Sequence, residues 1–390
     1  MSSGPLTLWM NGAKVGRWWS TRGGESRLEY APEWMADPRG RPISLSLPFT
    51  YDAGTLRGVM VDRWFDNLLP DSEAIRGRLA ARHRVDPRDS HALLGAIGRD
   101  CVGALQLVPE GEDPGRVHAI EYRTVTDAEV ASRLLSVPSG RPFDRGPDDD
   151  DMLRISLAGA QEKTAFLRHN GQWCVPTGAT PTTHIFKLPL GEVAVVKADF
   201  STSVENEWLC LTLLRAMELP AASCEVGHFP GPNGDVSALI VKRFDRLPTV
   251  SATGTAWIAR LPQEDCCQVS GTPSSMKYES DGGPGVSRIL DLLTTSDSSA
   301  ADMSTFVQAQ LAFWLLAAPD GHAKNFSIAL HAGGRYTLTP LYDVLSAWPI
   351  IGAGPKEWHD RTVSLAMGIR GTSSLHRHLN KIHVTHWKRL

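Results

Sequence analysis

An acid, an amide and a second acid near the end of the chain constrain its fold most strongly. Asp320 precedes Asn325 by five positions, and Asp343 follows further along. Between Asn325 and Asp343 lie two short apolar runs, Phe326–His331 and Tyr336–Leu341, which predict two strands joined by a tight, glycine-rich turn. A hairpin returns the chain close to its starting point, so we expect Asn325 and Asp343 to meet at one end of it.

Such a meeting would create a cation site with an acid beside it. An amide oxygen and a carboxylate are hard ligands, and Mg2+ is their usual guest when phosphates supply the other oxygens. Asp320, not needed as a ligand, would be free to accept a proton. Asp-x4-Asn followed by a metal-binding Asp is the layout of a kinase catalytic loop. A helix-terminal acid and an ordinary surface hairpin explain the same residues, because acid and amide pairs are common in turns.

The length of 390 residues predicts two or three domains. Pro138–Asp151 is rich in Pro, Gly and Asp, which predicts an exposed linker that closes the first domain. We therefore expect a first domain at residues 1–150, a nucleotide-binding part at 151–248 and a catalytic lobe at 249–390.

Composition limits the classes of function. A net charge of −3 gives no overall nucleic-acid footprint. The six cysteines form no CxxC pair, which predicts reduced thiols. The sequence has neither a signal-peptide pattern nor an apolar run of roughly 18 residues, so we expect a cytoplasmic protein without a membrane partner.

Local patterns predict a mixture of strands and helices. The turn Asn11-Gly12 between Leu6–Met10 and Ala13–Trp18 favours a type I′ hairpin. Further strands are predicted at Ile43–Leu47, Arg154–Leu157, Lys163–Arg168, Gln172–Val175, His184–Leu188, Cys224–Phe229 and Ser237–Phe244. Helices are predicted at Asp71–Val85, from a capping box at Thr126 to Leu135, after a second capping box of Thr202 and Glu205, and at Ile289–Leu293, Asp302–Ala318 and Ser374–Ile382. The helix after Thr202 would bury Val204, Trp208, Leu211 and Leu214 on one face.

A turn of small residues, Ser156–Thr164, lies between two predicted strands. Its backbone amides could cradle phosphate oxygens. It matches neither the Walker A spacing nor GxGxxG, and by itself it is better explained by a tight hairpin.

Lys187 lies between Phe186 and Leu188 in an apolar strand. A lysine there needs an anionic partner or must extend to water. An ATP phosphate and a helix glutamate would both serve, and Glu207 is the candidate for the ion pair, with Glu205 as the alternative.

Other features carry less information. Lys242–Phe244 ends a strand where a kinase hinge would read adenine, although it could be a simple strand end. Four histidines near the C-terminus, His376, His378, His383 and His386, lack the spacing of a zinc site. A serine hydrolase is disfavoured because Gly-x-Ser-x-Gly is absent.

The order of these parts along the chain favours a kinase over coincidence. A small-residue turn, a strand lysine, a helix glutamate, a hinge, a helical segment, the Asp-x4-Asn loop and a final acid follow as in kinases. We predict a phosphotransferase of the α+β class. Its fold would be two-lobed and protein-kinase-like, with a mixed β-rich N-terminal lobe and a mostly α-helical C-terminal lobe.

Several unusual strings resemble the HipA family, the serine/threonine-kinase toxins of bacterial toxin–antitoxin modules. They are Ser156–Thr164, Pro181–Pro189, Leu261–Asp265, Lys277–Pro284 and Asp320–Asn325, and the match runs from Leu6 to about Gly368. The chain ends at Leu390, where family members usually continue for several more helices, so we expect a shortened C-terminal lobe.

The resemblance implies ATP and Mg2+ as cofactors and a role for each matching residue. Asp320 would be the catalytic base, Asn325 and Asp343 the Mg2+ ligands, and Ser156 the autophosphorylation site. The nucleotide would contact Lys187, a flexible phosphate loop of Ala158, Gly159, Ala160, Gln161, Glu162 and Lys163, a hinge of Lys242, Arg243 and Phe244, and the residues His322, Lys324 and Tyr342. Lys242 stands where family members often have glutamate, but the hinge reads adenine largely through its backbone, so we expect ATP binding.

The resemblance also implies partners. The substrate would be a protein serine or threonine, as in glutamyl-tRNA synthetase, whose phosphorylation arrests growth. The antitoxin would be a HipB-like helix-turn-helix protein, through which the toxin reaches operator DNA. Two other functions fit the same sequence: an ATP-binding corepressor with little kinase activity, and a kinase for lipids or small molecules.

Overall fold

The computed structural model describes residues 4–21, 23–50, 54–139, 155–159, 161–193, 196–372 and 374–388. Most of the predicted linker, Pro138–Asp151, and residue Ala160 lie outside these ranges. No helix in the described part of the chain combines the length and hydropathy that a membrane span requires.

The N-terminal part is a five-stranded sheet covered by helices, with strand order β4-β3-β2-β1-β5. Its strands are β1 (Leu6–Met10), β2 (Ala13–Ser20), β3 (Ser26–Tyr30), β4 (Leu56–Arg57) and β5 (Leu105–Pro109). The β1–β2 hairpin is confirmed, and Asn11 and Gly12 both have positive φ, as a type I′ turn requires. The helices are α1 (Pro32–Ala36), α2 (Val59–Asp66), α3 (Glu73–His83) and α4 (Ser90–Ile97). The ring of Trp18 stacks on Phe65 of α2 at 3.8 Å, which fixes α2 against the sheet.

Two expectations in this part change. The helix predicted from Asp71 begins at Glu73, because the side chain of Ser72 accepts the hydrogen bond from Ile75 N. The strand predicted at Ile43–Leu47 is wrong. Ser44 forms only an isolated bridge to Leu47, since this stretch binds a carboxylate instead: Ser44 Oγ donates to Glu264 at 2.5 Å.

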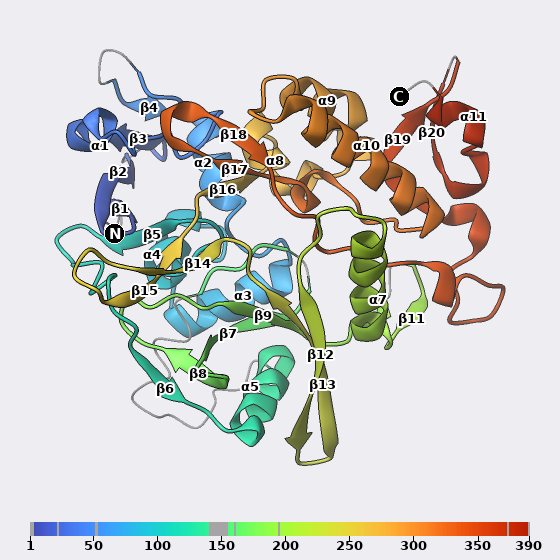
Figure 1. Cartoon of the computed structure of the whole chain (residues 1–390), viewed down its shortest axis with the longest axis horizontal. Coiled ribbons are helices and arrows are strands. Elements are labelled where there is room, and N and C mark those ends of the chain that lie inside the picture. The colour runs from blue at the N-terminus through green and yellow to red at the C-terminus, as the bar shows by residue number, and fades with distance from the viewer. Residues whose placement is uncertain are drawn as a thin grey trace.

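The second sheet has six strands in the order β12-β13-β9-β7-β8-β6. Its strands are β6 (Tyr122–Thr124), β7 (Lys163–His169), β8 (Gln172–Pro176), β9 (His184–Lys187), β12 (Cys224–Gly231) and β13 (Gly234–Lys242). Helix α5 (Asp127–Ser139), with the predicted capping box between Thr126 and Glu129, and helix α7 (Ser203–Ala216) pack against it, as Figure 1 shows. A short ribbon of β10 (Gly191–Val193) and β11 (Ala198–Phe200) precedes α7.

Three details of this sheet differ from expectation. In Arg154–Leu157, Arg154 lies outside the described residues and Ile155 forms a single bridge to Asp100 rather than a strand. The capping box of Thr202 and Glu205 does not form, and Ser203 Oγ instead accepts from Leu190 N at 2.9 Å. Trp208 faces outward and is 39% exposed, whereas the rest of the predicted apolar face is buried.

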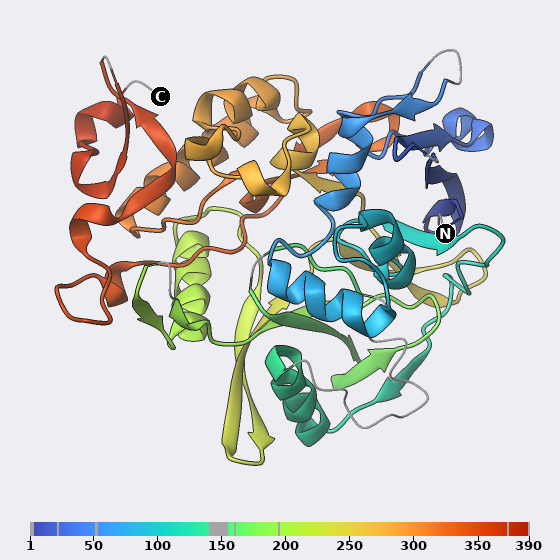
Figure 2. The ribbon, with the colours of Figure 1, turned by 180° about the vertical axis from the view of Figure 1, so that it is seen from behind.

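The C-terminal lobe lies above the second sheet in the view of Figure 1 and packs around Phe306, Phe313 and Phe326. Its helices are α8 (Cys266–Ser270), α9 (Val286–Leu293), α10 (Ser299–Leu315) and α11 (Val384–Trp387). Its strands form the sheet β16 (Gln263–Asp265), β17 (Ser327–Leu330) and β18 (Tyr336–Leu338) and the ribbon β19 (Ser364–Arg370) and β20 (Leu375–His378). The ribbon β14 (Arg246–Val250) and β15 (Ala256–Arg260) lies beside β5 and the second sheet instead (Figure 1), where Ile258 packs against Leu167 and Cys174. Figure 2 shows the N-terminal part lying alongside both of the other regions.

The helix predicted at Ser374–Ile382 is wrong. Its first half is strand β20, which pairs antiparallel with β19 through Leu375, His376 and His378. Tertiary pairing overrides a weak local pattern here.

Candidate active site

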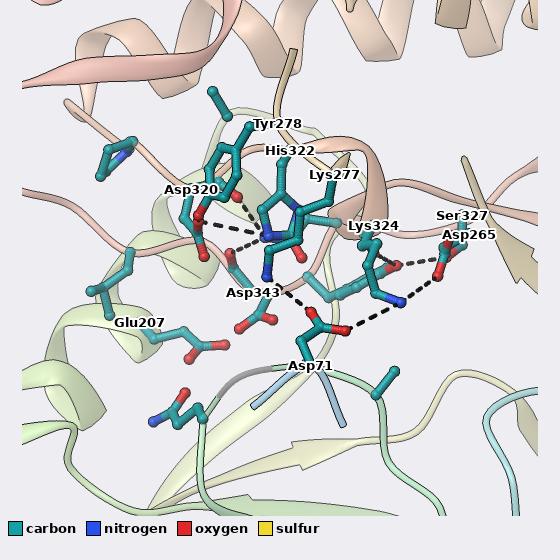
Figure 3. A pocket seen from close by; sticks show the side chains of 18 of the residues that line it. Asp71, Glu207, Asp265, Lys277, Tyr278, Asp320, His322, Lys324, Ser327 and Asp343 are labelled. Carbon is teal, nitrogen blue, oxygen red and sulfur yellow. Dashed lines mark hydrogen bonds and ion pairs between the residues drawn. The ribbon is translucent and has the colours of Figure 1, made fainter. Parts of the chain in front are cut away.

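A cavity of about 1020 Å³ lies where the three regions meet. Its wall includes Asp71 from the N-terminal part, Lys187 and Glu207 from the second sheet and α7, and Asp320 and Asp343 from the C-terminal lobe (Figure 3). Residues far apart in sequence therefore share one site.

Lys187, which lines the cavity, joins two carboxylates. Its Nζ lies 2.7 Å from Glu207 Oε1, the ion pair expected from the sequence, and it also donates to Asp343 Oδ1. Glu205, the alternative partner, is exposed on the other side of α7. Burial alone would lower the pKa of Lys187, but Asp343 and Glu207 raise it above its ordinary value, so the ammonium stays charged.

Asn325 and Asp343 meet as the hairpin predicted. Strands β17 and β18 pair antiparallel, and Asn325 Nδ2 donates to the carbonyl of Asp320 at 2.6 Å and to that of Asp343 at 3.5 Å. Because the amide nitrogen makes these bonds, the amide oxygen is oriented away from them. Asp343 has a φ of 61°, a left-handed conformation that aspartate tolerates better than most residues.

The oxygen atoms of Asn325 and Asp343 fit a hard divalent cation. Burial would raise the pKa of Asp343, but Lys187 and Lys163 hold it well below its usual range, so the carboxylate is ionised. An ionised carboxylate and an amide oxygen are the protein ligands that Mg2+ takes when phosphates complete its shell.

Asp320 opens to the cavity, with half of its side-chain surface exposed. The Tyr278 hydroxyl donates to Asp320 Oδ1, and His322 Nε2 lies 3.7 Å from the same oxygen. The ring of Tyr278 packs edge-on against His322 at 4.9 Å. Burial lowers the pKa of His322, which keeps the imidazole neutral. No local pattern assigns Tyr278 a role, because its contact with Asp320 joins residues 42 positions apart.

Lys324 and Tyr342 both line the cavity, and hydrogen bonds hold both side chains in place. Lys324 Nζ donates to Asn67 O at 2.9 Å and Asn67 Oδ1 at 2.8 Å, and it lies 3.4 Å from Asp265. The hydroxyl of Tyr342 donates to Lys324 O at 2.8 Å. Asn67 was missed as a site residue, and no local signal marks it. Asp265 ends the family-like string Leu261–Asp265, to which the sequence assigns no role beyond a polar wall.

The predicted phosphate loop lies at the cavity in part. Ser156 is fully buried, and its Oγ donates to Leu68 O at 2.7 Å. Lys163 Nζ donates back to Ala158 O at 2.7 Å, and Gln161 Nε2 donates to Leu188 O at 2.7 Å.

Glu162 departs from the expectation of a nucleotide contact. Its carboxylate forms an ion pair with Arg78 of α3 and does not line the cavity. Gly159 does line it, while Ala160 is outside the described residues.

The predicted hinge borders the cavity, but its backbone is partly engaged. Lys242 N donates to Ser223 O at 2.8 Å and Arg243 N to Thr183 O at 2.9 Å, so adenine contact by either amide would require breaking a bond. Phe244 packs 5.8 Å from the ring of Tyr342 on the cavity side.

Arg243 lines the cavity, and its guanidinium takes part in a buried charge network. It binds Asp245 at 2.9 Å and lies 3.5 Å from Asp100, which also pairs with Arg246 at 2.9 Å. Because Asp100 belongs to the N-terminal part, this network fixes the hinge to that part.

Among the described residues, no group of three or more histidine, cysteine or acidic side chains is arranged to hold a metal ion, and this includes the C-terminal histidines. The rings of His376 and His386 stack at 4.6 Å, a packing contact.

Comparisons with known proteins agree with this architecture. The model of the HipA N-terminal domain matches residues 6–108, and that of the HipA-like C-terminal domain matches residues 155–390. Y4mE of Sinorhizobium fredii, named as a candidate kinase, is 32% identical over 354 residues, which cover 90% of this chain and 79% of that protein. The serine/threonine-protein kinase toxin HipA of Shewanella oneidensis is 26% identical over 330 residues, 82% of this chain and 69% of that protein.

A solved structure shares the fold. It is the complex of Shewanella oneidensis HipA with HipB and operator DNA, with a TM-score of 0.76 at 24% identity, covering 98% of this chain and 82% of that one. The two-lobed α+β fold expected from the sequence is confirmed.

Proposed function

This chain belongs to the HipA family, and from that premise we propose that it is an ATP- and Mg2+-dependent kinase that phosphorylates serine or threonine in proteins. One observation carries the proposal: Lys187, Asp320, Asn325 and Asp343 line a single cavity large enough for a nucleotide. Relatives named as kinases support the reaction type.

Each residue has a task that its surroundings suit. Asp320, half exposed, accepts the proton of the acceptor hydroxyl as that oxygen attacks the γ-phosphate. Lys187, held by Glu207, places a positive charge against the phosphate oxygens. A Mg2+ ion held by Asn325 and Asp343 would neutralise charge that develops on the phosphates.

Tyr278 is part of the resting arrangement of the base. Its hydroxyl donates a hydrogen bond to Asp320 Oδ1, the oxygen to which an acceptor hydroxyl would donate. An acceptor must displace Tyr278 or use the other carboxylate oxygen.

We further propose that Ser156 is the autophosphorylation site, and that its phosphorylation inactivates the enzyme. The hydroxyl is buried against Leu68 O, so the segment at residues 155–159 must leave its position before Ser156 can accept phosphate. A phosphate of about −1.5 to −2 charge could not return to that carbonyl, and it would repel ATP phosphates.

The toxin role is proposed by family likeness. A relative of the same fold is assembled with HipB and operator DNA, which supports a HipB-like antitoxin that carries this chain to DNA. A protein such as glutamyl-tRNA synthetase is the proposed substrate, and its phosphorylation would arrest growth.

The test is expression of the wild type and Asp320→Asn in growing cells, with mass spectrometry of phosphorylated proteins. We expect growth arrest, a new phosphosite on a translation protein and phosphate on Ser156 in the wild type alone. Binding of an antitoxin without growth arrest or new phosphosites would favour the ATP-binding corepressor. Phosphate found only in lipids or small molecules would favour a lipid or small-molecule kinase.

A further inference from the structure

A short segment of the N-terminal part, Asn67–Asp71, enters the cavity between α2 and α3. Asn67 is 1% exposed and the side chain of Asp71 is 9% exposed, although both are polar. The lysines that contact them lie more than 200 positions away in the chain.

The segment holds the catalytic loop through Lys324. Asn67 accepts two hydrogen bonds from Lys324 Nζ, one at its carbonyl and one at Oδ1. Asp71 Oδ1 lies 3.6 Å from the same ammonium. Lys324 immediately precedes Asn325, so these contacts fix the backbone that carries one of the proposed Mg2+ ligands.

Asp71 also holds the residue next to Tyr278. Lys277 Nζ donates to Asp71 Oδ2 at 2.9 Å (Figure 3). The carboxylate therefore lies between two lysines, Lys277 and Lys324, that would otherwise repel each other in a poorly solvated place.

The same segment contacts the phosphate loop through its backbone. Asp71 N donates to Gly159 O at 3.0 Å, and Leu68 O accepts from Ser156 Oγ. Within this segment Asn67 and Asp71 thus contact the catalytic loop, and Leu68 and Asp71 contact the phosphate loop by their main chain.

We propose that Asn67 and Asp71 are positioning residues of the active site, so that the catalytic geometry is complete only with the N-terminal part in place. The proposal rests on the proposed kinase function for its effect on rate. Asp71 acts through Lys277 and Lys324: its charge sets where Tyr278 and Asn325 stand relative to Asp320. Asn67 acts through Lys324 alone.

The test compares Asp71→Asn with Asp71→Glu and a matched control. Asp71→Asn keeps the backbone bond to Gly159 and removes the charge between the lysines. We expect kcat for phosphate transfer to fall about tenfold to a hundredfold while KM for ATP changes less than about threefold, because misplacement of reacting groups affects the chemical step. Asp71→Glu, which restores the charge, should recover part of kcat.

The control is Ser72→Ala, next in the chain. It removes the cap of α3, the bond from Ile75 N to Ser72 Oγ, without touching either lysine. It should lower the unfolding temperature and leave kcat close to that of the wild type.

A second readout does not depend on activity. Amide hydrogen exchange across residues 320–326 should be faster in Asp71→Asn than in the wild type or in Ser72→Ala. Unchanged kcat and unchanged exchange in Asp71→Asn would overturn the proposal, as would equal losses of kcat in Asp71→Asn and Ser72→Ala. A wild type that transfers no phosphate would instead defeat the proposed function, and the exchange result would still decide the positioning role.

Discussion

Replacement of Lys187 by methionine should lower the free energy of unfolding and abolish phosphate transfer, and a second substitution should restore only the first. Lys187 and Glu207 are both almost fully buried, with side chains 8% and 4% exposed. Removal of one partner leaves a buried charge without compensation, which costs about 3–5 kcal/mol. Asp343 adds less to this cost, because 32% of its side chain is exposed and Lys163 remains nearby.

A second substitution isolates that cost. Lys187→Met combined with Glu207→Gln removes the uncompensated charge, so we expect the double variant to regain about 2 kcal/mol over Lys187→Met at pH 8. The regain should shrink towards pH 5. Burial raises the pKa of Glu207 to about 7 even with Lys187 present, so without the lysine the carboxyl is protonated and neutral at pH 5.

Urea unfolding followed by tryptophan fluorescence measures the stabilities, and labelled ATP measures transfer. Both variants should lose phosphate transfer, since neither has the lysine. A Lys187→Met variant within about 0.5 kcal/mol of the wild type, or a double variant less stable than Lys187→Met at pH 8, would refute the reasoning.

Three further predictions follow from single contacts. Asp343→Asn should abolish the Mg2+ dependence of ATP binding, measured by calorimetry with and without a chelator, and wild-type dependence should hold from pH 5 to 8 because Asp343 titrates only below its usual range. Burial raises the pKa of Glu264 to about 7 from 4.5, so the folded state holds a proton that the unfolded state loses. This group therefore lowers the free energy of unfolding by about 3 kcal/mol as the pH rises from about 4.5 to above about 7. Glu264→Gln should remove this pH dependence of the unfolding free energy, measured by urea titration at several pH values. Ser156→Ala should cost about 1 kcal/mol in the same assay and keep transfer to other proteins, whereas Ser156→Asp, which buries a charge, should lose transfer.

The parts of the site that sequence predicted are those fixed by local geometry. The hairpin that joins Asn325 to Asp343 follows from two apolar runs and a glycine-rich turn. The pairing of Lys187 with Glu207 follows from a charge placed in an apolar strand, which needs a partner on the next helix. In both cases a few neighbouring residues determine the outcome.

The contacts that sequence missed join distant segments. Asn67 and Asp71 lie in a segment whose local pattern predicts only a helix start, and Lys324 reaches Asn67 across 257 positions. Glu264 similarly prevents a strand at Ile43–Leu47 from a distance of about 220 positions. Propensity and periodicity describe neighbours along the chain, so they carry no information on which remote donor meets a buried carboxylate.

Phosphate transfer by the purified chain tests the central claim most directly. The wild type, incubated with Mg2+ and ATP labelled in the γ-phosphate, should transfer label to protein serine or threonine, and Asp320→Asn should bind ATP equally well but transfer at least about a hundredfold more slowly. Equal transfer by the two proteins, or no transfer by a wild type that binds ATP and Mg2+, would contradict the account.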